Sequence, residues 1–129
     1  MKIKDINRKE EDQLKDWEII NFNNKEFRIY EWENKEIGDF EIPNGFRLCK
    51  HSEFIELFDN KLIDYPEEDW LVYFVKHFSK RKQKEGYLSS CYLDRNSILF
   101  SYNSSLLYSN GSGRVVLVYG GKEIIKNGK

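Results

Sequence analysis

The most regular alternation of polar and apolar positions lies in residues 86–120 and predicts three short strands joined by polar turns. The last of these strands, residues 114–119 (RVVLVY), is the most apolar run in the chain. A further strand is predicted at residues 25–33 (KEFRIYEWE), where odd and even positions both carry large apolar side chains. Such a strand is expected to be covered on both faces for part of its length.

Helical spacing of apolar positions predicts helices nearer the N-terminus. A short helix is expected over about residues 8–18, inside a charged N-terminal segment of residues 1–20. Residues 45–48 (GFRL) are expected to lead into a second helix, in which Ser52 is the N-cap or His51 and Ser52 share the boundary. The apolar face of this helix ends at Phe58.

A longer helix is predicted to begin near Pro66 and to end at Gly86. Acidic residues follow its start and basic residues precede its end, as the helix dipole favours. The run WLVYFV on its own also fits a buried strand. The apolar residues at helical spacing are Trp70, Leu71, Phe74, Val75 and Phe78.

Two helices followed by short strands predict an α+β fold, with the helices packed on a small, irregular antiparallel sheet. At 129 residues the chain is expected to form a single domain, with a core over residues 25–120 and a polar tail at 121–129. An unpaired edge strand at residues 97–102 could mediate dimers, although no residue demands it.

Charge and cysteine content narrow the classes of function. The formal net charge of −1 gives no global field that would attract nucleic acid or an anionic membrane. No apolar stretch reaches the length of a signal peptide or a membrane span, so we expect an intracellular protein with no membrane partner. Cys49 and Cys91 are expected to be free thiols, and no cofactor or metal site is expected.

The segment between Tyr87 and Ser112 has an unusual composition. Four of its residues are Tyr, eight are Ser and three are Asn, which together make 15 of 26 positions. Adaptable recognition loops use this mixture, because Tyr supplies rigid contact area and the short polar residues supply adjustable hydrogen bonds. The same alternation also fits any half-exposed antiparallel sheet.

Several short motifs resemble those of C-type-lectin-like domains in the bacterial and phage branch, which includes proteins related to formylglycine-generating enzymes. Residues 43–48 (PNGFRL) and 52–54 (SEF) resemble the "P-x-G-[WF]-R-L-P-[ST]-x-x-E-[LFW]" segment of that family. The later strand motifs of the family match, in order, residues 86–90 (GYLSS), 98–102 (ILFSY) and 113–118 (GRVVLV). The resemblance covers about residues 40–120, but Cys49 and Lys50 stand where the family has Pro-[Ser/Thr].

This resemblance implies a C-type-lectin-like fold and a domain that binds proteins or sugars more often than it catalyses. In phages and mobile elements, some such domains display Tyr-, Ser- and Asn-rich surfaces. We therefore expect a non-enzymatic protein-binding module from a phage or mobile element, in the host cytoplasm or the virion. Its partner would be a host or viral protein, contacted through Tyr87, Tyr92, Tyr102, Asn103 and Tyr108.

Two other classes of function remain open. Residues 80–84 (KRKQK), which include Lys80 and Arg81, are the densest basic run, and residues 76–84 with Arg114 would serve a nucleic-acid-associated protein. A solvated helix end matched to the dipole is the favoured explanation of that run. Cys49 and His51 would suit a nucleophile and its base, but no carboxylate stands at a fixed position to orient the histidine.

Overall fold

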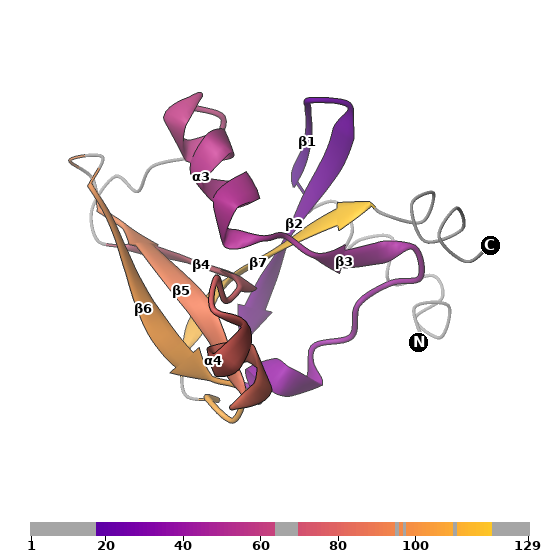
Figure 1. The fold of residues 1–129 in the computed structure, drawn as a ribbon. Helices are drawn as coiled ribbons and strands as arrows, with labels where there is room; N and C mark the ends of the chain where they lie inside the picture. The colour runs from indigo at the N-terminus through magenta and orange to yellow at the C-terminus, as the bar shows by residue number, and fades with distance from the viewer. Residues whose placement is uncertain (1–17, 64–69, 95, 97, 110, 120–129) are drawn as a thin grey trace.

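The computed structural model describes residues 18–63, 70–94, 96, 98–109 and 111–119. These residues form a strongly bent sheet of seven strands, and the helix α3 lies between the two ends of the sheet (Figure 1). The elements are β1 (Glu18–Phe22), β2 (Lys25–Glu33), the 3₁₀ turn η1 (Ile37–Asp39), β3 (Phe46–Leu48), α3 (His51–Asp59), β4 (Leu71–Lys76), α4 (Lys80–Lys84), β5 (Tyr87–Leu93), β6 (Leu99–Ser105) and β7 (Ser112–Tyr119).

Strand β7 is the centre of the sheet, whose order is β1-β2-β7-β4-β5-β6. One edge of β7 pairs with β2, and its other edge is shared by β4 at Arg114 and Val115 and by β3 from Leu117 to Tyr119. The β4–β7 pair is parallel, whereas the other strand pairs are antiparallel. The fold is therefore mixed α and β, compatible with the predicted α+β class, and the sheet dominates it.

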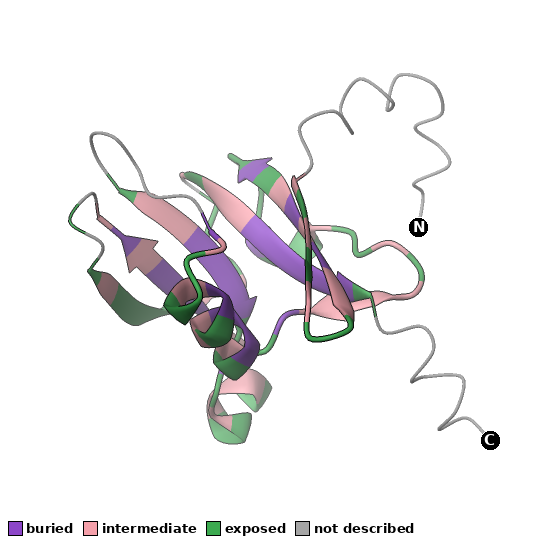
Figure 2. Ribbon diagram, turned by 90° about the horizontal axis from the view of Figure 1, so that it is seen from above, coloured by how far each residue is buried: buried purple, intermediate pink, exposed green. Residues whose placement is uncertain are grey.

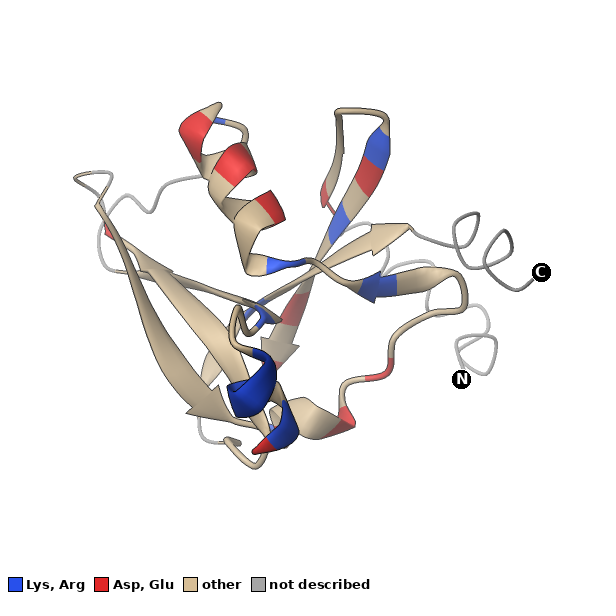
Figure 3. Ribbon diagram, viewed as in Figure 1, with Lys and Arg blue, Asp and Glu red and all other residues tan. Residues whose placement is uncertain are grey.

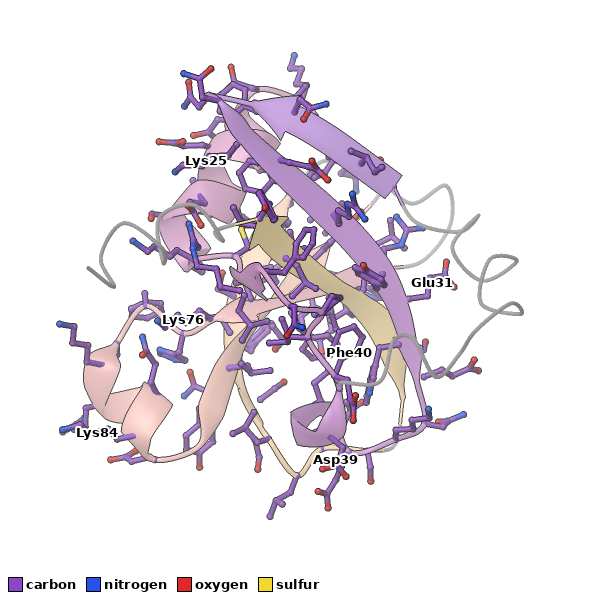
Figure 4. All side chains as sticks on the ribbon, turned by 90° about the vertical axis from the view of Figure 1, so that its right-hand side faces the viewer. Lys25, Glu31, Asp39, Phe40, Lys76 and Lys84 are labelled. Atoms are coloured by element: carbon purple, nitrogen blue, oxygen red, sulfur yellow. The ribbon has the colours of Figure 1, made fainter. Side chains whose placement is uncertain are left out.

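Each face of this sheet is covered over part of its extent, so the core has two parts. Phe54 and Leu57 of α3 pack on the first face, against side chains that include Phe27 and Val116. Segment 37–48 covers the second face, where Phe40 lies beside β2 with its ring 5.9 Å from that of Tyr30 (Figure 4). The buried positions follow the strands and the inner side of α3 (Figure 2).

The strands predicted at residues 25–33 and after Gly86 are confirmed. Lys25–Glu33 forms β2 with the predicted bounds, and its two faces are both buried, since Phe27 faces α3 and Trp32 packs in the second cluster. The three strands predicted after Gly86 are β5, β6 and β7. Residues 1–17 and 120–129, where an N-terminal helix and a polar tail were expected, lie outside the described residues, and Glu18 already belongs to β1.

The prediction of a helix up to Gly86 is wrong for most of its described length. Residues Leu71–Lys76 form the strand β4, and only Lys80–Lys84 is helical, as the short α4. Tyr73 faces the first part of the core and Phe74 the second, so the strand is apolar on both sides and loses the alternation that marks a half-exposed strand. The predicted start near Pro66 lies outside the described residues.

The second predicted helix exists as α3, and it begins two residues before the position that a Ser52 cap would give. Residues Phe46–Leu48 are the strand β3, and Lys50, not Ser52, occupies the N-cap position. The Glu53 carboxylate accepts the backbone N–H of Lys50 at 2.8 Å, which satisfies one of the donors at the helix start. A helix-capping acid three residues into the helix thus replaces the predicted serine cap.

Candidate binding surface

Four aromatic side chains gather on the face of β4–β6 that points away from α3. We call Trp70, Tyr92, Phe100 and Tyr102 the aromatic patch. The ring centroids are 5.3 Å apart for Tyr92 and Tyr102, 6.0 Å for Trp70 and Tyr92, and 6.1 Å for Trp70 and Phe100. Three of the side chains are well exposed, at 52% for Trp70, 41% for Phe100 and 56% for Tyr102. These rings contact one another, yet they remain open to solvent.

The strand register explains why these rings meet. Tyr92 of β5 pairs with Phe100 of β6, and Ser90 pairs with Tyr102, so the even positions of β6 share a face with Tyr92. Val72 of β4 pairs with Tyr92 on the same face, and Trp70 stands just before β4. Side chains alternate between faces along a strand, which places all four rings on one surface.

Tyr108 adjoins this surface but is anchored in the protein. Its ring lies 5.8 Å from that of Trp32 and 6.5 Å from that of Phe74, both of which are buried. Its backbone also bonds to η1, because the Ile37 N–H donates to the Tyr108 carbonyl at 2.9 Å. Burial raises the pKa of the Tyr92 hydroxyl, and the nearby phenols of Tyr108 and Tyr102 raise it further.

Three other residues predicted for the binding surface lie elsewhere. Asn103 faces α3, where its amide oxygen lies 2.6 Å from Nε2 of His77. The Tyr87 ring is capped by the Lys82 ammonium, 4.9 Å from the ring centroid. Arg114 donates a 3.1 Å hydrogen bond to the buried hydroxyl of Tyr73. Among the predicted residues, the structure thus brings Tyr92, Tyr102 and Tyr108 together.

Trp70 and Phe100 were missed in the sequence. Phe100 stands two positions before Tyr102, so strand alternation alone would have placed the two rings on one face. Trp70 fits the apolar stripe of the helix predicted up to Gly86, but the structure forms the strand β4 there. A composition count of Tyr, Ser and Asn cannot find either residue, whereas the alternation within β6 could have found Phe100.

On the face of β6 that points toward α3, two side chains of the strand form hydrogen bonds with histidines. Nε2 of His51, the first residue of α3, lies 3.0 Å from the hydroxyl of Ser101. His77 is buried, and its Nδ1 accepts the backbone N–H of Ser79 at 2.9 Å. That bond leaves the proton on Nε2, which donates it to the Asn103 amide oxygen. These two contacts hold the middle of β6 in place.

The predicted basic surface is carried by α4, which shows as the densest cluster of Lys and Arg in Figure 3. Lys80 and Arg81 are both exposed. Part of this charge is balanced locally, because Glu85 lies 3.8 Å from Arg81 and 3.4 Å from Lys82. Exposed pairs of this kind stabilise a protein little. The nucleic-acid-associated alternative stays a prediction.

The Cys49–His51 pair does not have the geometry of a nucleophile with its base. Cys49 is fully buried, and its thiol donates to the Lys50 carbonyl at 3.3 Å. Burial strongly raises the pKa of the Cys49 thiol, and the nearby Glu53 carboxylate raises it further. The His51 imidazole instead contacts Ser101, and burial, with the neighbouring His77, lowers its pKa.

Within the described ranges, no three His, Cys, Asp or Glu side chains gather in a way that would hold a metal ion. The described helices are all too short and polar to cross a membrane. Comparison of the chain with protein-family models, with curated proteins and with solved structures gave no match.

Proposed function

We propose that this protein is a non-enzymatic binding module, from a phage or mobile element, that recognises a protein partner through the aromatic patch. The observation that carries the proposal is the exposure of Trp70, Phe100 and Tyr102 on one continuous surface. Scattered apolar side chains are normal on a protein surface, but contiguous exposed patches mark interaction sites.

The surroundings of the patch support an interface rather than an ordinary surface. One third of the chain is charged, yet β5 and β6 contain no Lys, Arg, Asp or Glu (Figure 3). The centres of protein interfaces are likewise enriched in aromatic residues and depleted of charge. Large rings with few rotatable bonds also lose little conformational freedom when they bind.

The motif resemblance to C-type-lectin-like domains supports the same class of function, since that family binds proteins or sugars more often than it catalyses. Most of the resemblance lies outside the patch, in residues 43–48, 86–90 and 113–118, although the motif at residues 98–102 contains Phe100 and Tyr102. A protein partner fits the patch better than a sugar alone, because Trp and Tyr side chains dominate the energetics of protein interfaces.

The test is an affinity capture from a lysate of the organism that encodes the chain, with the wild type and two triple variants as baits. The patch variant is Trp70→Ala with Phe100→Ala and Tyr102→Ala. The control variant is Ile19→Ala with Ile42→Ala and Tyr119→Ala, which removes three exposed apolar side chains outside the patch. Circular dichroism first establishes that both variants are folded.

We expect a stoichiometric protein that the wild type and the control retain and the patch variant loses. Truncation of one hot-spot ring typically costs about 2 kcal/mol of binding energy or more, so three such losses abolish capture. Retention of the same protein by the patch variant would refute the proposal. Capture of nucleic acid alone, by all three baits, would favour the basic surface of α4.

A further inference from the structure

Strand β6 ends the sheet, and among the described residues no strand pairs with its outer edge. Two hydrogen bonds fix which of its backbone groups point outward. The Asp94 N–H donates to the Ile98 carbonyl at 3.1 Å, and the Leu106 N–H donates to the Gly86 carbonyl at 2.9 Å. In an antiparallel ladder, inward and outward residues alternate. The even positions of β6 therefore bond to β5, and the odd positions present their N–H and C=O groups to solvent.

The outward positions are Leu99, Ser101 and Asn103, followed by Ser105. The Ser105 carbonyl is already used, because it accepts the Tyr108 N–H at 3.0 Å. The side chains of Ser101 and Asn103 are held from the α3 side by His51 and His77. The open edge is thus centred on Ser101, and it is held in the extended conformation that an added strand requires.

This edge lacks the features that normally prevent strands from pairing with other chains. Proteins protect their edge strands with charged residues, prolines or β-bulges. The seven residues of β6 (LFSYNSS) contain no charge and no proline, and they pair with β5 in unbroken register. One third of the chain is charged, yet this edge carries no charge. This absence of charge indicates that the edge pairs with another strand.

We propose that a second copy of this chain pairs with β6 in antiparallel orientation, with Ser101 on the two-fold axis. This register uses the three fully open residues, because Ser101 faces its own copy and Leu99 faces Asn103 of the second copy. In this register Phe100 of each copy lies opposite Tyr102 of the other copy. These two symmetric pairs are non-hydrogen-bonded pairs, whose side chains lie closer together than those of hydrogen-bonded pairs. A strand without charge can meet itself without repulsion.

The inference goes beyond the proposed function, since it concerns the edge of the sheet rather than its face. A two-fold axis perpendicular to the sheet keeps both aromatic patches on the same side. Pairing would therefore join two sets of exposed rings into one surface. A specific interface buries about 800 Å² on each partner. The exposed area of two adjoining aromatic patches comes nearer to this value than the exposed area of one patch.

The first test is sedimentation equilibrium on the wild type and two substitutions at Ser101. Ser101→Pro removes the outward N–H without touching the bonds to β5, as proline is tolerated on edge strands. Ser101→Ala is the matched control, because it also loses the hydroxyl contact with His51 but keeps the N–H. We expect the wild type and Ser101→Ala to sediment at twice the 15.5 kDa of one chain, and Ser101→Pro to sediment as one chain.

The second test fixes the register and does not depend on proline. Two double variants share Phe100→Lys and differ only in Tyr102→Lys or Tyr102→Glu. In the proposed register position 100 faces position 102 of the second copy, so opposite charges should retain the dimer and like charges should weaken it by about tenfold or more. Circular dichroism establishes that both double variants are folded.

A wild type that sediments as one chain at all concentrations would overturn the proposal. So would a dimer that persists in Ser101→Pro, or equal dissociation of the two charge variants. The outcome for the proposed function can be distinguished from the outcome for the pairing. A monomer that still captures its partner through the patch would refute only the pairing, whereas a dimer that captures nothing would refute only the partner.

Discussion

The buried Glu53 carboxylate accepts hydrogen bonds from several donors. It is 6% exposed and accepts hydrogen bonds from both terminal nitrogens of Arg47, at 2.9 and 2.8 Å, and from Lys25 at 2.9 Å. Burial alone would raise its pKa, but the bonds from Arg47, the Lys50 backbone and Lys25 outweigh burial and lower the pKa to about 2. This one side chain joins β2, β3 and α3.

The lowered pKa of Glu53 predicts a specific loss of stability in acid. A carboxyl group whose pKa is lower in the folded state stabilises the protein above its unfolded pKa, here 4.5. That contribution, about 3 kcal/mol, disappears as the pH falls from 4.5 toward 2. Glu53→Gln should cost a similar amount at pH 7, because it leaves buried donors poorly matched.

Urea denaturation at neutral and acid pH checks this prediction. The control is Glu56→Gln on the same helix, since the Glu56 side chain is exposed. Wild type and Glu56→Gln should lose stability together as the pH falls, whereas Glu53→Gln should lose much less. An equal acid response of all three proteins would show that Glu53 does not carry the effect.

The two cysteines should be almost inert in the folded protein. Both are fully buried, and burial raises the pKa of Cys91 to about 11 and that of Cys49 higher still. Because the thiolate is the reactive form, both thiols stay protonated and unreactive near pH 8. Alkylation followed by mass spectrometry should show modification only in denaturant. Fast modification of Cys49 in buffer would revive a nucleophilic role.

Among the elements, β4 gives the clearest prediction for packing. Phe74 and Phe78 fall on one stripe of the predicted helix, but in the structure Phe74 is 1% exposed and Phe78 is 67% exposed. Phe74→Ala should cost about 3–5 kcal/mol of unfolding free energy, and Phe78→Ala less than about 1 kcal/mol. Chemical denaturation of the two variants measures the difference. Similar large losses in both would indicate a helix.

The sequence could predict those elements whose pattern arises from the element alone. The structure confirms strands β2, β5, β6 and β7. Strands β2, β4 and β7 are all buried on both faces, but the apolar residues of β4 continue at helical spacing to Phe78, so the local pattern favoured a helix there. The candidate surface follows a similar rule. The alternation within β5 and β6 places Tyr92 and Tyr102 on one face, whereas the position of Trp70 depends on where β4 begins.

At the scale of the whole molecule, the central position of β7 sets the order of local stability. This strand is buried from Val115 to Val118 and pairs with β2, β3 and β4. We expect its amide hydrogens to exchange only through global unfolding, since any local opening would have to break several strand pairs. Native-state hydrogen exchange checks this. Faster exchange in β7 than in β1 would contradict it.

Chain order gives the position of β7 a consequence for biosynthesis. A ribosome makes the β1–β2 hairpin first and the β4–β6 meander later, and among the described strands only β7 pairs with both. Until β7 leaves the exit tunnel, the cluster that contains Phe27 and Tyr73 lacks the side chains of Val116 and Val118. We expect the nascent chain to stay protease-sensitive and dependent on chaperones until β7 emerges, and then to fold as one unit.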